Sequence, residues 1–298
     1  MSVIITSEFE LALESIRSGK NVLITGKAGT GKSTLLRNYL ESNHQKNVLV
    51  TAPTGVAALN VDGFTIHRTF GLRPGLYPDD LKPGGKWHPG ANTAAVLRTV
   101  DVLVIDEISM VRADLFDMVD LALRRIRKTD APFGGVQLVL VGDLLQLPPV
   151  VTDYEAELFK TNWDSPYFFS SHCYPELEIS NITLTTVWRQ TDEEFIEVLN
   201  QVREGSLGKA ALEVLNGQVD PAFKAPGDWV TLAAHRRTVE KINQERLNEL
   251  DAPKLISIAE YSGQTDEKSF SGSSELHYAI GARVMTIIND GAGRFVNG

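Results

Sequence analysis

Residues 21–34 read NVLITGKAGTGKST, and this stretch decides the fold. Its first five residues form a short apolar run that is typical of a buried strand, and a glycine-rich turn follows directly. Residues 26–33 match the pattern G-x4-G-K-S, in which a strand leads through a phosphate-binding loop into a helix. The order strand, loop, helix therefore predicts a P-loop nucleotide-binding fold.

Three further apolar runs repeat the strand pattern: NVLVTA from Asn47, DVLVID from Asp101 and VQLVLVGD from Val136. Helical patterns lie between them, most clearly over residues 115–126. Apolar strands that alternate with helices predict an α/β fold with a parallel sheet covered by helices on both faces. Ligands bind such sheets at the carboxyl ends of the strands. Each polar motif described below begins where one of these strands ends.

The glycine-rich loop and the helix turn after it supply the candidate nucleotide-binding residues. Glycines let backbone N–H groups close around a phosphate, and the helix N-terminus adds positive potential. We expect Lys32 to reach the β- and γ-phosphates and the Ser33 hydroxyl to ligate Mg²⁺. The predicted nucleotide-binding residues are Gly26, Ala28, Gly29, Thr30, Gly31, Lys32, Ser33 and Thr34.

Acidic and amide side chains follow two of the other strands. Asp106 and Glu107 end the run DVLVI, where an aspartate can hold Mg²⁺ and an adjacent glutamate can activate the attacking water. Glu107 favours hydrolysis over phosphoryl transfer to a small acceptor. Gln146 follows the next strand, and its amide can contact either the γ-phosphate or the attacking water. A simple polar turn before Pro148 and Pro149 is the alternative interpretation.

Other candidates lie at later or neighbouring strand ends. Arg189 could stabilise transition-state charge if it lay near the γ-phosphate, although its spacing alone is more typical of a solvated surface arginine. The turn at Pro53 and Thr54 and the segment with Thr65 and His67 offer hydroxyls and backbone donors that suit sugar–phosphate contacts. A lone histidine such as His67 is more typical of a buried structural position.

An irregular segment, residues 71–99, interrupts the strand–helix alternation. It is rich in proline and glycine and carries two aromatic residues, Tyr77 and Trp87. Its four basic residues outnumber its two acidic ones. Aromatic rings among basic residues can stack on bases or press against a duplex junction, whereas an ordinary surface loop is the alternative.

The composition limits the other function classes. The 298 residues contain one cysteine, which excludes an intramolecular disulfide framework, and no acidic, histidine or cysteine cluster has the spacing of a zinc site. A net charge of −9 argues against nonspecific coating of nucleic acid. The start lacks a signal-peptide pattern, so we expect a cytoplasmic or nucleoid-associated protein without membrane contact. A linker-like composition near Asp220 predicts two domains, residues 1–220 and 221–298.

Five motifs occur in a characteristic order: AGTGKS, TAPTGVAALNVDGFTIH, IDEISM, VGDLLQLPPV and WRQ, at residues 28–33, 51–67, 105–110, 141–150 and 188–190. Together they resemble the Pif-one/RecD branch of superfamily-one DNA helicases, with a shorter echo in REG at residues 203–205. The resemblance implies a monomeric motor that uses ATP and Mg²⁺ to move 5′ to 3′ on single-stranded DNA. It also implies unwinding at duplex and fork junctions in replication, repair or recombination, and two RecA-like domains.

Roles for individual residues follow from this resemblance. Lys32, Ser33, Asp106 and Glu107 become the ATPase core, with Ser33 and Asp106 as the Mg²⁺ ligands. The resemblance makes Gln146 a γ-phosphate sensor and Arg189 an arginine finger. It makes Pro53, Thr54, Thr65 and His67 contacts to the DNA strand, and it places a small wedge at residues 71–99.

The sequence departs from the family pattern in three places. The helix over residues 7–18 lacks the glutamine that reads adenine, and His235 stands where relatives often have asparagine. The later motifs of the family fall beyond Gly298, so we expect a truncated chain with part of a second RecA-like domain, able to bind ATP but impaired in unwinding. The alternatives are an ATP-gated DNA-binding module without unwinding activity, or another P-loop ATPase such as a AAA-type remodeller.

Overall fold

The computed structural model describes residues 6–43, 45–73, 75–153, 155–188, 192–226, 229–260, 274–286 and 294. The chain divides into two compact units, Met1–Ala211 and Leu212–Gly298, and each is described by itself. The domain boundary near Asp220 stays a prediction.

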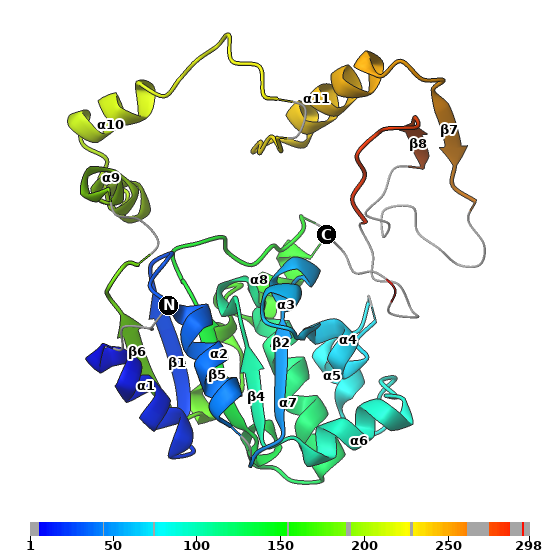
Figure 1. The fold of residues 1–298 in the computed structure, drawn as a ribbon. Helices are drawn as coiled ribbons and strands as arrows, with labels where there is room; N and C mark the ends of the chain where they lie inside the picture. Colours follow the sequence, from blue (N-terminus) through cyan, green and yellow to red (C-terminus); the bar gives the residue numbers. More distant parts are fainter. Residues whose placement is uncertain are drawn as a thin grey trace. The chain divides into compact units, whose positions relative to one another are not determined.

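The first unit contains a six-stranded sheet with helices on both faces (Figure 1). Its strands are β1 (Asn21–Gly26), β2 (Val48–Ala52), β3 (Phe64–Thr65), β4 (Val102–Ile105), β5 (Gln137–Gly142) and β6 (Ile179–Leu184). Its α-helices are α1 (Ser7–Arg17), α2 (Lys32–Ser42), α3 (Gly55–Asn60), α4 (Ile66–Phe70), α5 (Pro78–Leu81), α6 (Ala91–Thr99), α7 (Ala113–Arg127), α8 (Ala156–Asn162), α9 (Glu193–Glu204) and α10 (Lys209–Asn216), the last of which continues into the second unit. Short 3₁₀ turns are η1 (Ile108–Met110), η2 (Pro132–Gly135), η3 (Phe168–Ser170) and η4 (Tyr174–Glu176).

All neighbouring strands of this sheet run parallel, in the order β3-β2-β4-β5-β1-β6. The four strands predicted from the sequence are β1, β2, β4 and β5, so the α/β fold with a helix-flanked parallel sheet is confirmed. Register aligns their carboxyl ends, since Thr25 lies opposite Gly142 and Thr51 lies opposite Ile105. The loops that leave these strands therefore open onto one edge of the sheet.

Alternate strand residues face two separate cores, because successive side chains of a strand point to opposite faces. Val102 and Val104 join α1 and α2 on one face, whereas Leu103 and Ile105 join α7 on the other. Strands buried on both faces read as continuous apolar runs, which explains why sequence periodicity located them so closely.

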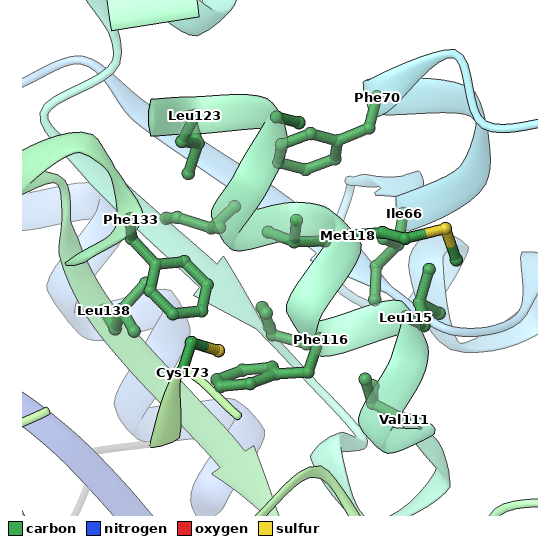
Figure 2. Close-up of a cluster of buried hydrophobic side chains, with 14 of the residues drawn as sticks. Ile66, Phe70, Val111, Leu115, Phe116, Met118, Leu123, Phe133, Leu138 and Cys173 are labelled. Carbon is green, nitrogen blue, oxygen red and sulfur yellow. The ribbon is translucent and has the colours of Figure 1, made fainter. Parts of the chain in front are cut away.

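Helix α7 carries the larger of the two cores. Phe116 is fully buried, and its ring contacts those of Phe133 and Phe168 at centroid distances of 4.9 and 5.6 Å. Figure 2 shows Phe116 beside Phe133. Cys173 is buried in the same cluster. This packing holds α7 against the face of the sheet to which Leu103 and Ile105 of β4 belong.

The irregular segment over residues 71–99 packs against α7 through α5, α6 and Trp87. The Trp87 side chain is 1% exposed, and its Nε1 donates a hydrogen bond of 3.0 Å to the carbonyl of Phe70. Arg125 of α7 lies over the same ring, 5.6 Å from its centroid. The hypothesis that Trp87 stacks on bases is therefore wrong, because burying this large apolar ring stabilises the segment on the core.

The second unit contains α11 (Arg236–Glu249) and an antiparallel pair of strands, β7 (Leu255–Ile258) and β8 (Glu275–Tyr278). The apolar run at residues 229–234 (WVTLAA) forms no strand, since this stretch pairs with no described strand and Leu232 is 92% exposed. A strand requires a hydrogen-bonded neighbour, so apolar composition alone was insufficient to produce it. Within the described residues, no helix is both long enough and apolar enough to cross a bilayer.

Candidate functional site

The loop between β1 and α2 is tightly closed. A Cβ atom on Gly26 would lie 2.6 Å from the Leu184 carbonyl oxygen and 2.7 Å from Thr30 Oγ1, so only glycine fits there. Thr30 is buried, and its hydroxyl donates a hydrogen bond of 2.9 Å to the carbonyl of Lys27. Gly31, with φ of +89°, is the N-cap of α2. The loop geometry is therefore fixed by its own residues.

Lys32 begins α2 and turns back into this loop. Its Nζ donates to the carbonyl oxygens of Gly26 and Lys27 at 2.7 and 3.0 Å. Burial lowers the pKa of Lys32, and the acidic residues that follow β5 and β4 act in the opposite direction, Asp143 most strongly. The ammonium group is thus held among backbone carbonyls at the carboxyl edge of the sheet.

The remaining predicted loop residues lie around Lys32. Ser33 and Thr34 form the exposed first turn of α2, next to Lys32. Ala28 is exposed at the turn, and Gly29 adopts φ of +79°. The predicted nucleotide-binding residues therefore form one continuous loop and helix turn.

The acidic pair follows β4 at the same edge. Asp106 is 6% exposed, and burial raises its pKa to about 6, with the charge of Glu107 acting in the same direction and Lys32 against it. Glu107 adopts φ of 50° and ψ of 44°, a left-handed conformation that is uncommon outside glycine and is concentrated at functional sites. Glu107 thus holds an uncommon backbone conformation directly after the buried carboxylate of Asp106.

The oxygen atoms of Asp106 and Ser33 are of the kind that Mg²⁺ prefers, in sites that phosphate oxygens and water complete. A buried carboxylate beside a second carboxylate is disfavoured in its charged form, and a divalent cation relieves that cost. The residues present therefore fit a Mg²⁺ ion.

Residues after β5 form a second polar group at this edge. Asp143 is 2% exposed, and its Oδ2 accepts a hydrogen bond of 3.3 Å from Nε2 of Gln146. Its Oδ1 lies 2.6 Å from Nη2 of Arg203, in the last turn of α9. Gln146 itself is exposed. The sequence predicted a role for Gln146 but none for Asp143, which lies in the same VGDLLQLPPV motif. It also predicted none for Arg203, whose only signal was the REG triplet.

Trp188, the first residue of the WRQ motif, contacts the phosphate loop. Its backbone N–H donates a hydrogen bond of 2.8 Å to the carbonyl of Gly29, and its ring lies 3.7 Å from the position of a Cβ on Gly31. Trp188 belongs to the WRQ motif, but the sequence pattern predicts no role for it. The predicted arginine finger, Arg189, lies outside the described residues.

The candidate DNA contacts lie at the other end of the same sheet edge. Ala52 of β2 lies opposite Thr65 of β3, which brings Pro53 and Thr54 alongside Thr65. The Thr54 hydroxyl accepts a hydrogen bond from the N–H of Ala57, as an N-cap of α3. Thr65 caps α4 in the same way. Each hydroxyl keeps its O–H to donate to a phosphate oxygen.

His67 follows on α4, and its side chain is exposed in part. Neighbouring protein atoms desolvate the ring and lower the pKa of His67, an effect that Asp114 opposes and Arg112 reinforces. The lowered pKa favours the neutral form of the ring at pH 7.

A family model described as PIF1-like helicase matches residues 5–213. The chain belongs to the PIF1-like helicase family. The ATP-dependent DNA helicase PIF1 of Danio rerio is 35% identical over 295 residues, which are 96% of this chain and 44% of that protein. The human protein of the same name is 34% identical over 304 residues, 99% of this chain and 45% of that protein. The chain thus spans less than half the length of these curated relatives of the PIF1-like family.

Solved structures of PIF1-type helicases have the same fold. Bacteroides Pif1 bound to single-stranded DNA is 35% identical with a TM-score of 0.85, and the match covers all of this chain and 68% of that one. A Pif1 structure that addresses DNA unwinding at forked duplexes has a TM-score of 0.86 at 35% identity, covering 99% of this chain and 70% of that one.

Proposed function

We propose that this chain is the ATP-hydrolysing part of a DNA helicase that moves 5′ to 3′ on single-stranded DNA and unwinds duplexes and forks. The observation that carries the proposal is the common sheet edge. The phosphate loop after β1, the acidic pair after β4 and Gln146 after β5 open onto the edge where the β2 and β3 loops offer strand contacts. The named activity of the PIF1 relatives supports the same conclusion.

Each hydrolytic role has a matching group in the structure. The loop from Gly26 to Gly31 cradles the phosphates, and Lys32 binds their terminal oxygens. Ser33 and Asp106 would hold Mg²⁺, which supplies charge neutralisation when bound. Glu107 would accept a proton from the attacking water, as the carboxylate next to Asp106 at the end of β4. A Pif1 structure in complex with ADP-AlF3 and single-stranded DNA supports the nucleotide assignment.

The DNA contacts are proposed to be independent of sequence. The hydroxyls of Thr54 and Thr65 and the backbone at Pro53 can bind sugar and phosphate, while His67 remains neutral. β2 and β4 are hydrogen-bonded neighbours, so a shift of the acidic pair after β4 would act on the strand that carries the β2 loop. ATP hydrolysis and strand movement would be coupled through this contact.

The test measures ATP hydrolysis by the 298-residue chain with and without single-stranded DNA, followed by unwinding of duplexes with 5′ or 3′ tails. DNA should stimulate turnover, and Lys32→Ala should abolish it. Lys20→Ala is the matched control, because Lys20 is exposed at the opposite end of β1. Hydrolysis that survives Lys32→Ala would refute the assigned site. A preference for 3′ tails would refute the polarity, and DNA binding gated by ATP without turnover would favour a binding module.

A further inference from the structure

The last turn of α9 is anchored beside the nucleotide site at two places. Arg203 lies 2.6 Å from the buried carboxylate of Asp143, and its own side chain is only 24% exposed. The adjacent Glu204 lies 4.0 Å from Lys27 of the phosphate loop. The positive charge of Arg203 also contributes to lowering the pKa of Lys32. A helix that begins 50 residues beyond β5 therefore ends against the groups expected to handle the terminal phosphate.

Asp143 connects Arg203 to Gln146 through its two oxygens. Oδ1 faces Nη2 of Arg203, and Oδ2 accepts the 3.3 Å hydrogen bond from Gln146 Nε2. The backbone N–H of Leu145 also donates to Oδ1 at 3.2 Å, which keeps the carboxylate in place. The charge-assisted bond to arginine is the shortest of these contacts and the one that most restricts the carboxylate.

This arrangement decides which end of the Gln146 amide is available. A carboxylate only accepts hydrogen bonds, so the amide must turn its nitrogen toward Asp143. Its Oε1 then points away from Asp143 and is free to accept a hydrogen bond. An attacking water needs such an acceptor, whereas a phosphate oxygen could bind only the second N–H of Nε2, because Asp143 accepts from the first.

We propose that Arg203 is a positioning residue for ATP hydrolysis: through Asp143 it holds the Gln146 amide so that Oε1 orients the attacking water. The inference rests on the proposed function and deepens it. Gln146 is exposed, so without the Arg203–Asp143 pair its amide rotates freely and presents either end. Loss of Arg203 should therefore weaken the state in which water attacks and leave ground-state nucleotide binding intact.

The experiment measures equilibrium binding of fluorescent mant-ADP to the 298-residue chain with Mg²⁺, with and without aluminium fluoride, which mimics the phosphoryl group under attack. Arg203→Gln should reduce the preference for the aluminium fluoride complex by about tenfold, while the Kd for mant-ADP alone changes by less than about threefold. Arg203→Lys should restore part of the preference. Lys209→Gln, which makes the same charge change at an exposed site on α10, should behave like the unmodified chain.

Two further variants separate positioning from a general structural role. Arg203→Gln should add no further loss in a Gln146→Ala background, because the amide that it positions is already absent. The double variant Asp143→Asn with Arg203→Gln removes both charges, so it avoids a buried unpaired carboxylate and should fold while still losing the preference.

The contrary outcomes are distinct. If Arg203→Gln reduces the preference as much in the Gln146→Ala background as in the unmodified chain, the inference is overturned, because Arg203 then acts without Gln146. A higher Kd for mant-ADP alone would overturn it too, because Arg203 would then act on structure or on the nucleotide directly. An unchanged preference in Arg203→Gln would overturn it as well. Failure of the unmodified chain to bind mant-ADP at all would refute the proposed function itself.

Discussion

Within the phosphate loop, we expect Gly26, where β1 ends, to tolerate substitution least. An alanine Cβ there would lie 2.6 Å from the carbonyl oxygen of Leu184, about 0.8 Å short of the ordinary contact distance of 3.4 Å. It would also lie 2.7 Å from Thr30 Oγ1. The hydroxyl can rotate away only by giving up its bond to Lys27, and the carbonyl cannot rotate at all without disturbing β6.

The expected cost follows from this geometry. Gly26 and Leu184 are register partners in the β1–β6 ladder, so relieving the overlap requires the two strands to separate locally. Overpacking of this kind costs about 1–3 kcal/mol, and we expect a loss near 2 kcal/mol because one of the two clashing groups is backbone. Displacing the loop should also weaken nucleotide binding by about tenfold.

Urea unfolding and mant-ADP titration of Gly26→Ala measure both effects. Gly90→Ala is the matched control, because a Cβ at Gly90 meets no atom within 4 Å and its φ of −61° suits alanine. That control should change the free energy of unfolding by less than about 0.5 kcal/mol and leave nucleotide binding unchanged. A Gly26→Ala chain with the stability and affinity of the unmodified chain would refute the close packing described for the loop.

Three other predictions test neighbouring features. In an NMR titration, the pKa of His67 should lie below its ordinary value of 6.5, and a midpoint above 6.5 would contradict this. Because folding lowers this pKa, protonation of the ring at lower pH should destabilise the folded chain. Trp188 fluorescence should change when nucleotide binds, because its ring lies against the phosphate loop, and Trp188→Phe should remove the signal; a signal that persists would place its source elsewhere. Trp87→Phe should cost about 1 kcal/mol of stability through the lost hydrogen bond to Phe70 without changing DNA affinity, and a weakened affinity would restore the stacking hypothesis.

Much of the site follows from local sequence because its parts are local. The loop from Gly26 to Lys32 has its chemistry in one stretch, and strands buried on both faces are visible as apolar runs. Parallel pairing then brings Asp106 and Gln146 to the same edge without further information. The fold class and the predicted phosphate-binding residues therefore followed from short-range patterns.

The contacts that sequence reasoning missed join residues far apart in the chain. Arg203 reaches Asp143 across 60 positions, and Trp188 reaches Gly29 through its backbone, which carries no residue-type signal. Trp87 was misjudged because basic neighbours suggested a nucleic-acid surface, whereas the ring had a buried partner in Phe70. Pairing partners and burial are properties of the folded chain, and composition alone does not specify them.

The central claim is that Glu107 activates the water that attacks ATP at the edge of this sheet. The most direct test measures two quantities for Glu107→Gln: the rate of phosphate release from ATP and the affinity for ATP. Glu107→Gln should bind ATP with a Kd within about threefold of the unmodified chain while its DNA-stimulated turnover falls by a factor on the order of 100 or more. Turnover at the unmodified rate would contradict the claim, and so would a loss of activity that arises entirely from lost ATP binding.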